Sequence, residues 1–258
     1  MNVKLKRGFF LAVALSLGLG AYAADKRNKF FGIPIPDGTS PVTYSKLPPV
    51  ELKVLGSITN DLLLWASLDS LDNGGVAWSK EARLGAFTTV VKMKTDAGRV
   101  AADFSAPGSI LKLDPPVVLG PKYTIAAWLL LPAPKSNGVI FHGGQHAFLE
   151  TSEKAFSCRI DTTNTNYAAG AAPITGWHHV ALVCNGKETV FYYDGRKAGA
   201  IPQAIADTLD WIGNEPNPEK LGDRMAGAID DVFVFGKDLS MFEVGALVKF
   251  RPPAPKKP

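Results

Sequence analysis

The sequence predicts an all-β protein, a sandwich or barrel of antiparallel strands with one short helix near the C-terminus. Short runs rich in β-branched and aromatic residues recur along the chain, separated by glycine, proline, asparagine or charged residues. One segment combines helical spacing with a capping signal. With 46% apolar residues the chain can bury a sizeable core, and we expect one domain over residues 56–250.

The N-terminus is typical of a cleavable secretory signal. Lys4, Lys6 and Arg7 precede an apolar run from Phe9 to Gly20, and Ala21-Tyr22-Ala23 supplies the small residues of a cleavage site. The run is too short to cross a bilayer, which takes about 20 apolar residues, and no later stretch predicts a transmembrane helix. We therefore expect cleavage after residue 23 and export to the periplasm, the cell surface or the medium. An uncleaved anchor is the alternative.

Removal of the signal leaves the protein almost neutral. The chain has 28 basic and 24 acidic residues, and three of the basic ones lie in the signal. The mature chain then has 25 basic and 24 acidic residues, a net charge of +1, which argues against a nucleic-acid partner.

Proline-rich segments flank the predicted domain. Prolines at positions 34, 36, 41, 48 and 49 predict an extended linker over residues 24–55. The last segment, RPPAPKKP at residues 251–258, predicts a solvated tail.

Strand-like runs fill about the first half of the predicted domain. Each is bounded by turn-forming or charged residues, as expected for short strands joined by turns. They are Leu62–Asp69, Val100–Phe104, Ser109–Leu113, Tyr123–Leu131, Gly138–Phe141, Ala147–Thr151 and Ala155–Asp161.

The segment GWHHVALVCNGKETVFYYDGRKAGA, residues 176–200, predicts a three-strand meander. Asn185-Gly186 and Asp194-Gly195 are favoured two-residue hairpin turns, because these residues tolerate the positive φ that such turns require. We expect one strand before the first turn, one between the two turns and one after the second.

The predicted helix follows Leu239. Ser240 and Glu243 form a capping box, in which each side chain meets the other residue's backbone N–H. Leu239 and Val244 are spaced as a hydrophobic staple. A helix this short is stable only when it packs on the rest of the protein. Its predicted apolar face comprises Val244, Leu247 and Val248.

The order of these features resembles the laminin-G-like, concanavalin A-like lectin/glucanase jelly-roll family, in the form common among secreted bacterial proteins. The similarity runs from about Leu62 to Phe250. It rests on segments in family order: LLLWASLD, VAADFSAPGSILKL, YTIAAWLLLP, GWHHVALVCNGKETVFYYDGRKAG, DWIGN and AGAIDDVFVFGKDLSMFEVGAL. The resemblance implies an antiparallel jelly-roll β-sandwich with one concave sheet. It implies functions from carbohydrate binding and adhesion to glycoside hydrolysis, so fold does not decide function.

The resemblance also implies a structural calcium site that joins the first and last strands. The matching acids are Asp69, Asp230 and Asp231, and calcium favours carboxylate ligands together with backbone carbonyls. Alternatively, Asp230 caps backbone groups at a strand edge and Asp69 shapes the DNGG turn. Calcium is the one cofactor that the sequence suggests.

The sequence does not predict an enzyme, and we assign no catalytic residue. Glycosidases need two carboxylates about 5–10 Å apart, and hydrolases of the resembled fold carry them in an E-x-D-x-E strand that is absent here. Glu150 and Glu153 are three residues apart, and Asp230 and Asp231 are adjacent. Each pair should therefore point to opposite faces of a strand. A G-x-S-x-G nucleophile elbow is also absent.

The four histidines do not predict a metal site. His142 and His146 have the spacing of helical zinc ligands, but they flank glycines between strands. His178 and His179 alternate across one strand. We expect packed or surface histidines, and a zinc site shared by His142 and His179 has no support in the pattern.

Cys158 and Cys184 each lie in a strand-like run. Export to an oxidising compartment permits a disulfide between them, whereas a free cysteine in a strand behaves as a small buried hydrophobe. The sequence leaves both alternatives open, because it does not give the distance between them.

Three aromatic residues are candidate ligand contacts, because sugars bind to exposed aromatic faces beside polar groups. Trp211 lies in LDWIGNEPNPE beside a polar loop, and Tyr193 and Trp78 border turns. A structural role is the alternative for Trp211. Trp128 and Trp177 match core tryptophans of the resembled family and are interpreted as structural.

These observations give a leading hypothesis and two alternatives. The first is a secreted, non-catalytic binding or adhesion module whose partner is a glycan or an extracellular or envelope protein. The second is a structural or assembly protein of the cell envelope, which would expose a large apolar patch. The third is a glycoside hydrolase, which lacks the paired acids that it requires.

Overall fold

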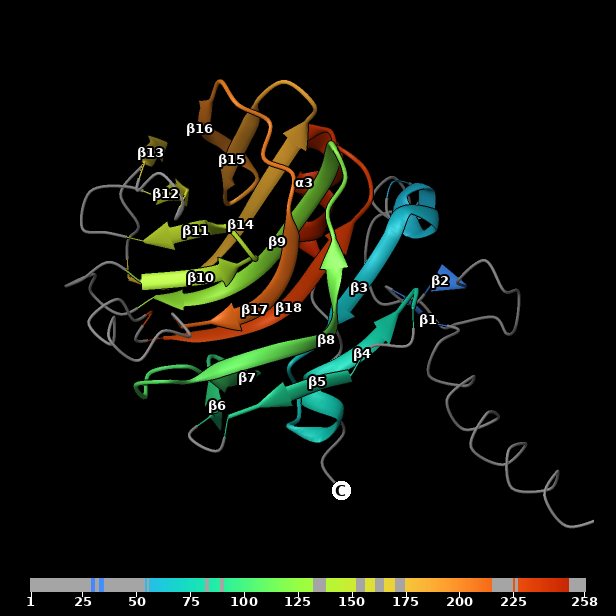
Figure 1. Ribbon diagram of the computed structural model, residues 1–258. Helices are drawn as coiled ribbons and strands as arrows, with labels where there is room; N and C mark the ends of the chain where they lie inside the picture. The colour runs from blue at the N-terminus through green and yellow to red at the C-terminus, as the bar shows by residue number, and fades with distance from the viewer. Residues whose placement is uncertain are drawn as a thin grey trace, which may run out of the picture.

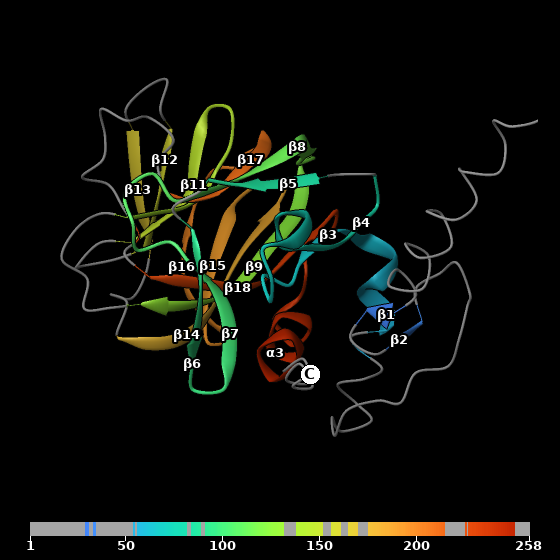
Figure 2. The same ribbon diagram turned by 90° about the horizontal axis from the view of Figure 1, so that it is seen from below.

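Two antiparallel sheets pack face to face, and a helix lies on the outer side of one of them (Figure 1, Figure 2). The computed structural model describes residues 29–30, 33–34, 54, 56–81, 84–88, 91–131, 138–151, 156–160, 165–169, 175–214, 225 and 227–250. The predicted signal at 1–23, the tail at 251–258 and most of the linker at 24–55 lie outside these residues. The sandwich predicted from the sequence is confirmed.

One sheet has seven strands and forms the front layer of Figure 1. Every neighbouring pair in it is antiparallel. In spatial order its strands are β13 (Thr165–Ala169), β12 (Phe156–Ile160), β11 (His146–Thr151), β10 (Gly138–His142), β17 (Thr208–Gly213), β8 (Ile110–Val118) and β5 (Leu84–Phe87).

The second sheet has nine strands and lies behind the first. Along its main path the strands are β16 (Arg196–Ile201), β15 (Thr189–Tyr193), β14 (Gly176–Asn185), β9 (Lys122–Leu131), β18 (Ala228–Phe235), β3 (Leu62–Ala66) and β4 (Val76–Ser79). A hairpin of β6 (Lys92–Asp96) and β7 (Arg99–Asp103) completes it, because β7 pairs with the beginning of β18.

Smaller elements join the strands at the start of the domain. Two 3₁₀ helices, η1 (Thr59–Asp61) and η2 (Asp72–Gly75), precede β3 and β4, and η2 contains the DNGG turn. Within the predicted linker, β1 (Lys29–Phe30) pairs with β2 (Ile33–Pro34).

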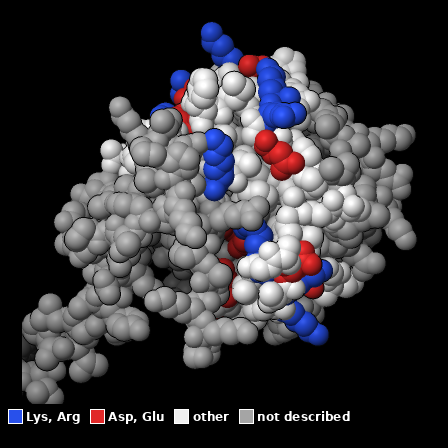
Figure 3. Space-filling view, turned by 180° about the vertical axis from the view of Figure 1, so that it is seen from behind, with Lys and Arg blue, Asp and Glu red and all other residues white. Residues whose placement is uncertain are grey.

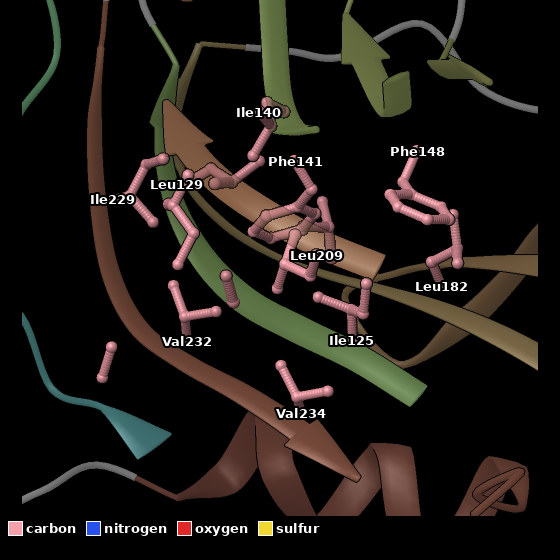
Figure 4. Close-up of a cluster of buried hydrophobic side chains, with 14 of the residues drawn as sticks. Ile125, Leu129, Ile140, Phe141, Phe148, Leu182, Leu209, Ile229, Val232 and Val234 are labelled. Atoms are coloured by element: carbon pink, nitrogen blue, oxygen red, sulfur yellow. The ribbon is translucent and has the colours of Figure 1, made fainter. Parts of the chain in front are cut away.

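The main core lies between the two sheets (Figure 4). Because side chains alternate between the faces of a strand, every second residue of β9 enters this core. Figure 4 labels ten of the buried side chains, which are Ile125, Leu129, Ile140, Phe141, Phe148, Leu182, Leu209, Ile229, Val232 and Val234.

The helix α3 (Met241–Lys249) covers a second, smaller core on the outer side of the nine-stranded sheet (Figure 2). The predicted capping box is present, since Ser240 N donates to Glu243 Oε2 at 2.7 Å and Glu243 N donates to Ser240 Oγ at 3.4 Å. Among the described residues, no helix is both long enough and apolar enough to cross a membrane.

The face that α3 buries differs from the predicted one at a single position. Val244, Ala246 and Leu247 are buried, whereas Val248 is only half-buried. Val248 instead lies over the turn at Gly195, where a Cβ would be 3.2 Å from Val248 Cγ2. Val248 therefore packs against the β15–β16 hairpin, whereas the sequence predicted that it would pack against the face of the sheet.

The two predicted hairpin turns are present, but one is shifted by a residue. Asp194 and Gly195 both have positive φ, 47° and 77°, as predicted. In the first hairpin only Gly186 has positive φ, 88°. The loop is centred on Gly186-Lys187, and Asn185 ends β14 while its Oδ1 accepts the N–H groups of Lys187 and Glu188 at 3.0 Å.

The disulfide alternative is not formed. Cys184 is a free, buried thiol whose Sγ donates to the carbonyl of Pro121 at 3.3 Å. It packs within the main core as a small hydrophobe. Cys158 lies in β12 of the other sheet, and its side chain is outside the described residues.

Candidate functional site

Trp211 stands on the outer face of the seven-stranded sheet, between a lysine and a histidine of neighbouring strands. In the register it lies opposite Lys112 of β8 and opposite His142 of β10. The Trp211 and His142 rings meet edge to face, with centroids 5.3 Å apart. Lys112 is exposed, Trp211 is partly exposed and His142 is buried. A row of polar and aromatic groups therefore crosses the middle of this sheet.

A β-bulge brings Asp210 to the same side as Trp211. Leu209 and Ile212 both enter the main core, and the register of β17 with β8 shifts between Leu209 and Trp211. Since two residues lie between two inward-facing ones, neither of them faces the core. Asp210 Oδ1 is enclosed yet accepts no hydrogen bond from the part of the chain that the structure describes. We call Lys112, Asp210, Trp211 and His142 the Trp211 platform.

Asp207 forms hydrogen bonds with the turn at residues 143–146, which lies beside this platform. Its Oδ2 accepts the N–H of Gln145 at 2.8 Å and lies 2.9 Å from His146 Nδ1. Gly143 has no room for a side chain, because a Cβ there would lie 2.1 Å from the Thr208 carbonyl oxygen. A Cβ at Gly144 would approach the carboxylates of Asp207 and Asp210. The turn is thereby fixed against the edge of the platform.

Tyr193 and Trp78, the other two aromatic candidates, are not part of the platform. Tyr193 belongs to β15 of the other sheet, packs partly buried against the main core and stacks on His178 at 4.7 Å between centroids. Trp78 lies in β4 opposite Trp65, and its side chain is outside the described residues. Of the three candidates, Trp211 is the one that the structure places on the face of the seven-stranded sheet.

A second polar cluster surrounds Arg99 on the outer side of the nine-stranded sheet. On the surface seen from behind, the basic and acidic side chains stand scattered among uncharged ones (Figure 3). Arg99 Nη1 is 2.5 Å from Asp230 Oδ2 and 3.7 Å from Asp231 Oδ2. Its guanidinium carbon lies 4.2 Å from the centroid of the Trp128 ring and 5.4 Å from that of Trp177. The two tryptophans that were interpreted as structural thus enclose a cation.

Asp230 and Asp231 do not diverge, although adjacent strand residues were expected to. The register of β18 with β9 shifts between Asp230 and Phe233, and Asp231 has a φ of +48°. This bulge brings both carboxylates to Arg99. Burial raises the pKa of Asp230 to about 7, and Arg99 lowers it in part. Burial and the neighbouring Asp230 raise the pKa of Asp231 well above its usual value.

Asp69, the third predicted calcium ligand, interacts with the same arginine. Burial raises its pKa, while a hydrogen bond from Ser67 and the charge of Arg99 lower it. Within the described ranges no three His, Cys, Asp or Glu side chains are arranged to hold a metal ion. The calcium site stays a prediction, and the cation that contacts Asp230 and Asp231 in this structure is Arg99.

The two histidines of β14, His178 and His179, are packed within the fold rather than arranged around a ligand site. His178 Nδ1 lies 2.8 Å from Asp194 Oδ2. His179 is fully buried with its ring edge-on to Trp128, and neither ring nitrogen has a hydrogen-bond partner among the described residues. Burial lowers its pKa to about 3, so its imidazole is neutral. His142 lies in the opposite sheet, which separates it from His179.

The sequence itself matches a known family. A sequence model described as the concanavalin A-like lectin/glucanases superfamily matches residues 105–245. The chain belongs to this superfamily. The matched residues include the Trp211 platform and both aspartates of β18, but neither Asp69 nor Arg99. No curated protein matches the chain.

Solved structures with this superfamily's fold are similar to the chain at low identity. Domain 4 of an extracellular arabinanase from Geobacillus stearothermophilus, solved with arabinotriose, has 17% identity and a TM-score of 0.56, over 73% of this chain and 98% of that one. Trypanosoma rangeli sialidase has 12% identity and a TM-score of 0.57, over 92% and 39%. The ligand-binding domain of botulinum neurotoxin serotype D, solved with N-acetylneuraminic acid, has 12% and 0.52, over 76% and 52%.

These similarities show the lectin/glucanase-like fold alone. The chain spans about half of the neurotoxin chain and about two fifths of the sialidase. What the three proteins bind or cleave does not transfer to this chain at such identities.

Proposed function

We propose that this protein is an exported, non-catalytic module that binds carbohydrate through the Trp211 platform. The observation that carries the proposal is the partly exposed indole of Trp211 on a sheet face between polar side chains. An indole face packs against the C–H groups of a sugar ring, while nearby donors and acceptors orient its hydroxyls. Exposed Lys112 supplies a donor, and the partly exposed carboxylate side chain of Asp210 lies beside the indole.

The way the platform is held also supports binding. Its side chains come from three adjacent strands, and Asp207 fixes the neighbouring turn. Groups on strands keep their positions before a ligand arrives, so little conformational entropy is lost on binding.

The positions of the carboxylates support a non-catalytic role. Asp230 and Asp231 are 2% and 0% exposed, and they lie on the far side of the sandwich from Trp211. Asp207 and Asp210 lie nearer, but Asp207 Oδ2 is occupied by His146 and the backbone of Gln145, and Asp210 Oδ1 is enclosed. Neither arrangement offers the acid and nucleophile pair that flanks a glycosidic bond.

The test is a glycan array probed with the mature chain from residue 24, with calcium and with a chelator. We expect selective binding that Trp211→Ala abolishes and that Lys112→Ala and Asp210→Asn weaken. Phe242→Ala is the matched control, because Phe242 is an aromatic side chain that is 78% exposed on α3, on the other side of the protein. Binding that survives Trp211→Ala, or no binding by a folded protein, would contradict the proposal.

A second candidate function, assembly within the cell envelope, is favoured by a separate observation. Met241 and Phe242 are adjacent on α3 and are 52% and 78% exposed. Exposed apolar side chains of this kind can contact a protein partner. A silent glycan array together with cross-linking that Phe242→Ala removes would favour this candidate over carbohydrate binding.

A further inference from the structure

Arg99 is held in place by the hairpin that it begins. Asp96 ends β6 and Arg99 begins β7, and the two residues between them, Ala97 and Gly98, have φ values of 48° and 79°. Two consecutive positive φ angles make a tight two-residue turn. Asp96 Oδ2 also accepts the indole N–H of Trp177 at 2.9 Å, so the tip of the hairpin is anchored on β14.

From this position Arg99 connects segments that are far apart in the chain. Its side chain is 13% exposed and bonds to Asp230, which lies 131 residues later in β18. The second oxygen of Asp231 accepts the indole N–H of Trp65 in β3 at 3.2 Å. A buried carboxylate needs a counter-charge or a proton. Here the guanidinium supplies that charge at the junction of the first and last strands of the domain.

Calcium does not fit the cluster as it stands. A calcium ion takes six to eight oxygen ligands at about 2.3–2.6 Å. The described carboxylates near Arg99 are those of Asp69, Asp230 and Asp231, but no three acidic side chains of the described ranges are arranged to hold a metal ion. The rings of Trp128 and Trp177 occupy other sides of the guanidinium, at 4.2 and 5.4 Å from its carbon. A divalent ion bound there would also lie beside the guanidinium and be repelled by it.

We propose that Arg99 takes the place of the calcium ion that the family resemblance implies, so that the junction between β3, β7 and β18 is held by the chain's own cation. The stability of the protein is then independent of calcium. This inference does not depend on carbohydrate binding, and it is tested on unfolding rather than on a ligand.

The experiment is thermal unfolding of the full mature chain after treatment with a chelator, with and without millimolar calcium. We expect the same Tm in both conditions. Arg99→Met keeps the apolar stem but removes the charge, and it should lower Tm by about 10 °C, because it leaves buried carboxylates without a partner. Adding Asp230→Asn should recover part of that loss. Arg196→Met is the matched control, since Arg196 is exposed at the start of β16.

A Tm of the unmodified protein that rises with calcium and falls with chelator would overturn the proposal. So would an Arg99→Met variant as stable as Arg196→Met, or a double variant no more stable than Arg99→Met alone. Should Arg99→Met fail to fold, Arg99→Lys tests the same point. It keeps the charge and must retain a Tm that does not respond to calcium.

Discussion

Single residues in two β-bulges determine which polar groups this protein presents. In β17 the bulge turns Asp210 and Trp211 away from the core together, and in β18 it does the same for Asp230 and Asp231. The bulge of β17 lies in the seven-stranded sheet and that of β18 in the nine-stranded sheet, so the two clusters are on opposite sides of the sandwich. A bulge re-aims side chains without ending the strand. The platform and the arginine cluster are therefore separate sites that can be altered one at a time.

His179 should determine part of the dependence of stability on pH. Its pKa is about 3 in the folded protein because of burial and about 6.5 in the unfolded chain. Below pH 6.5 the unfolded chain takes up a proton that the folded protein does not, so stability falls as the pH falls towards 3. This effect should lower the free energy of unfolding by about 3 kcal/mol between pH 6.5 and 4, and the His179→Leu variant should not show that loss. Urea titrations across this range measure it, and parallel slopes for the two proteins would disprove it.

At the scale of elements, two glycines with positive φ differ in how tightly their surroundings are packed. Gly98 and Gly213 both have positive φ, 79° and 100°. A Cβ at Gly98 would meet nothing within 4 Å, whereas a Cβ at Gly213 would lie 2.3 Å from Phe104 Cδ1. Alanine substitutions at the two positions therefore distinguish the energetic cost of backbone strain from that of a steric clash.

We expect Gly98→Ala to cost about 1 kcal/mol, because alanine resists positive φ. Gly213→Ala should cost about 3 kcal/mol or more, because the core around Phe104 must also move. Urea denaturation of the two variants gives both values. Equal losses would show that Phe104 yields freely and that the clash has no energetic weight.

The cap of α3 can be tested separately from its packing. Ser240→Ala removes the hydroxyl that accepts the N–H of Glu243 and should lower the free energy of unfolding by about 1 kcal/mol. Ser240→Asp retains an acceptor and should stay close to the original stability. Denaturant titration decides between them, and an alanine variant as stable as the aspartate one would refute the role of the cap.

Elements with a local signal could be predicted from the sequence, and those that depend on distant neighbours could not. The turn at Asp194 and the capping box at Ser240 are set by residues a few positions apart. By contrast β6 and β13 lack a strong apolar pattern, and they are strands because a neighbour pairs with them. The turn at Asn185 was misplaced by one residue because both Asn185 and Gly186 suit positive φ, and only the register chooses between them.

The same limit applies to the candidate site. Trp211 could be selected from the sequence, because it is an aromatic residue beside a polar loop. Lys112 and His142 join it only through strand pairing. Asp210 was adjacent in the sequence but was missed, since a regular strand would have pointed it away from Trp211. Arg99 has no local signal at all, as its partner is 131 residues away.

At the scale of the whole molecule, we expect stability that does not depend on a disulfide. Cys184 is a free thiol in the main core and bonds to the Pro121 carbonyl. Tm measured with and without a reducing agent should therefore be the same. A Tm that falls on reduction would instead indicate a bond to Cys158.

Processing of the N-terminus is a second prediction at this scale. Residues 1–23 carry the signal pattern, and we expect a mature chain that begins at Ala24. N-terminal sequencing or intact mass of the protein expressed with its full sequence measures this. A chain that keeps residue 1 and sediments with membranes would support the uncleaved anchor.

The pairing of β18 with three other strands has a consequence for how the chain folds. β3 and β7 both lie beside β18, and Leu62 is opposite Phe235. While the ribosome has not yet added β18, neither strand has its partner, so the larger sheet cannot close until residues 228–235 have been synthesised. Contacts between residues so distant in sequence also form slowly. Such a nascent chain stays unfolded for longer, which is the state that a translocation channel threads.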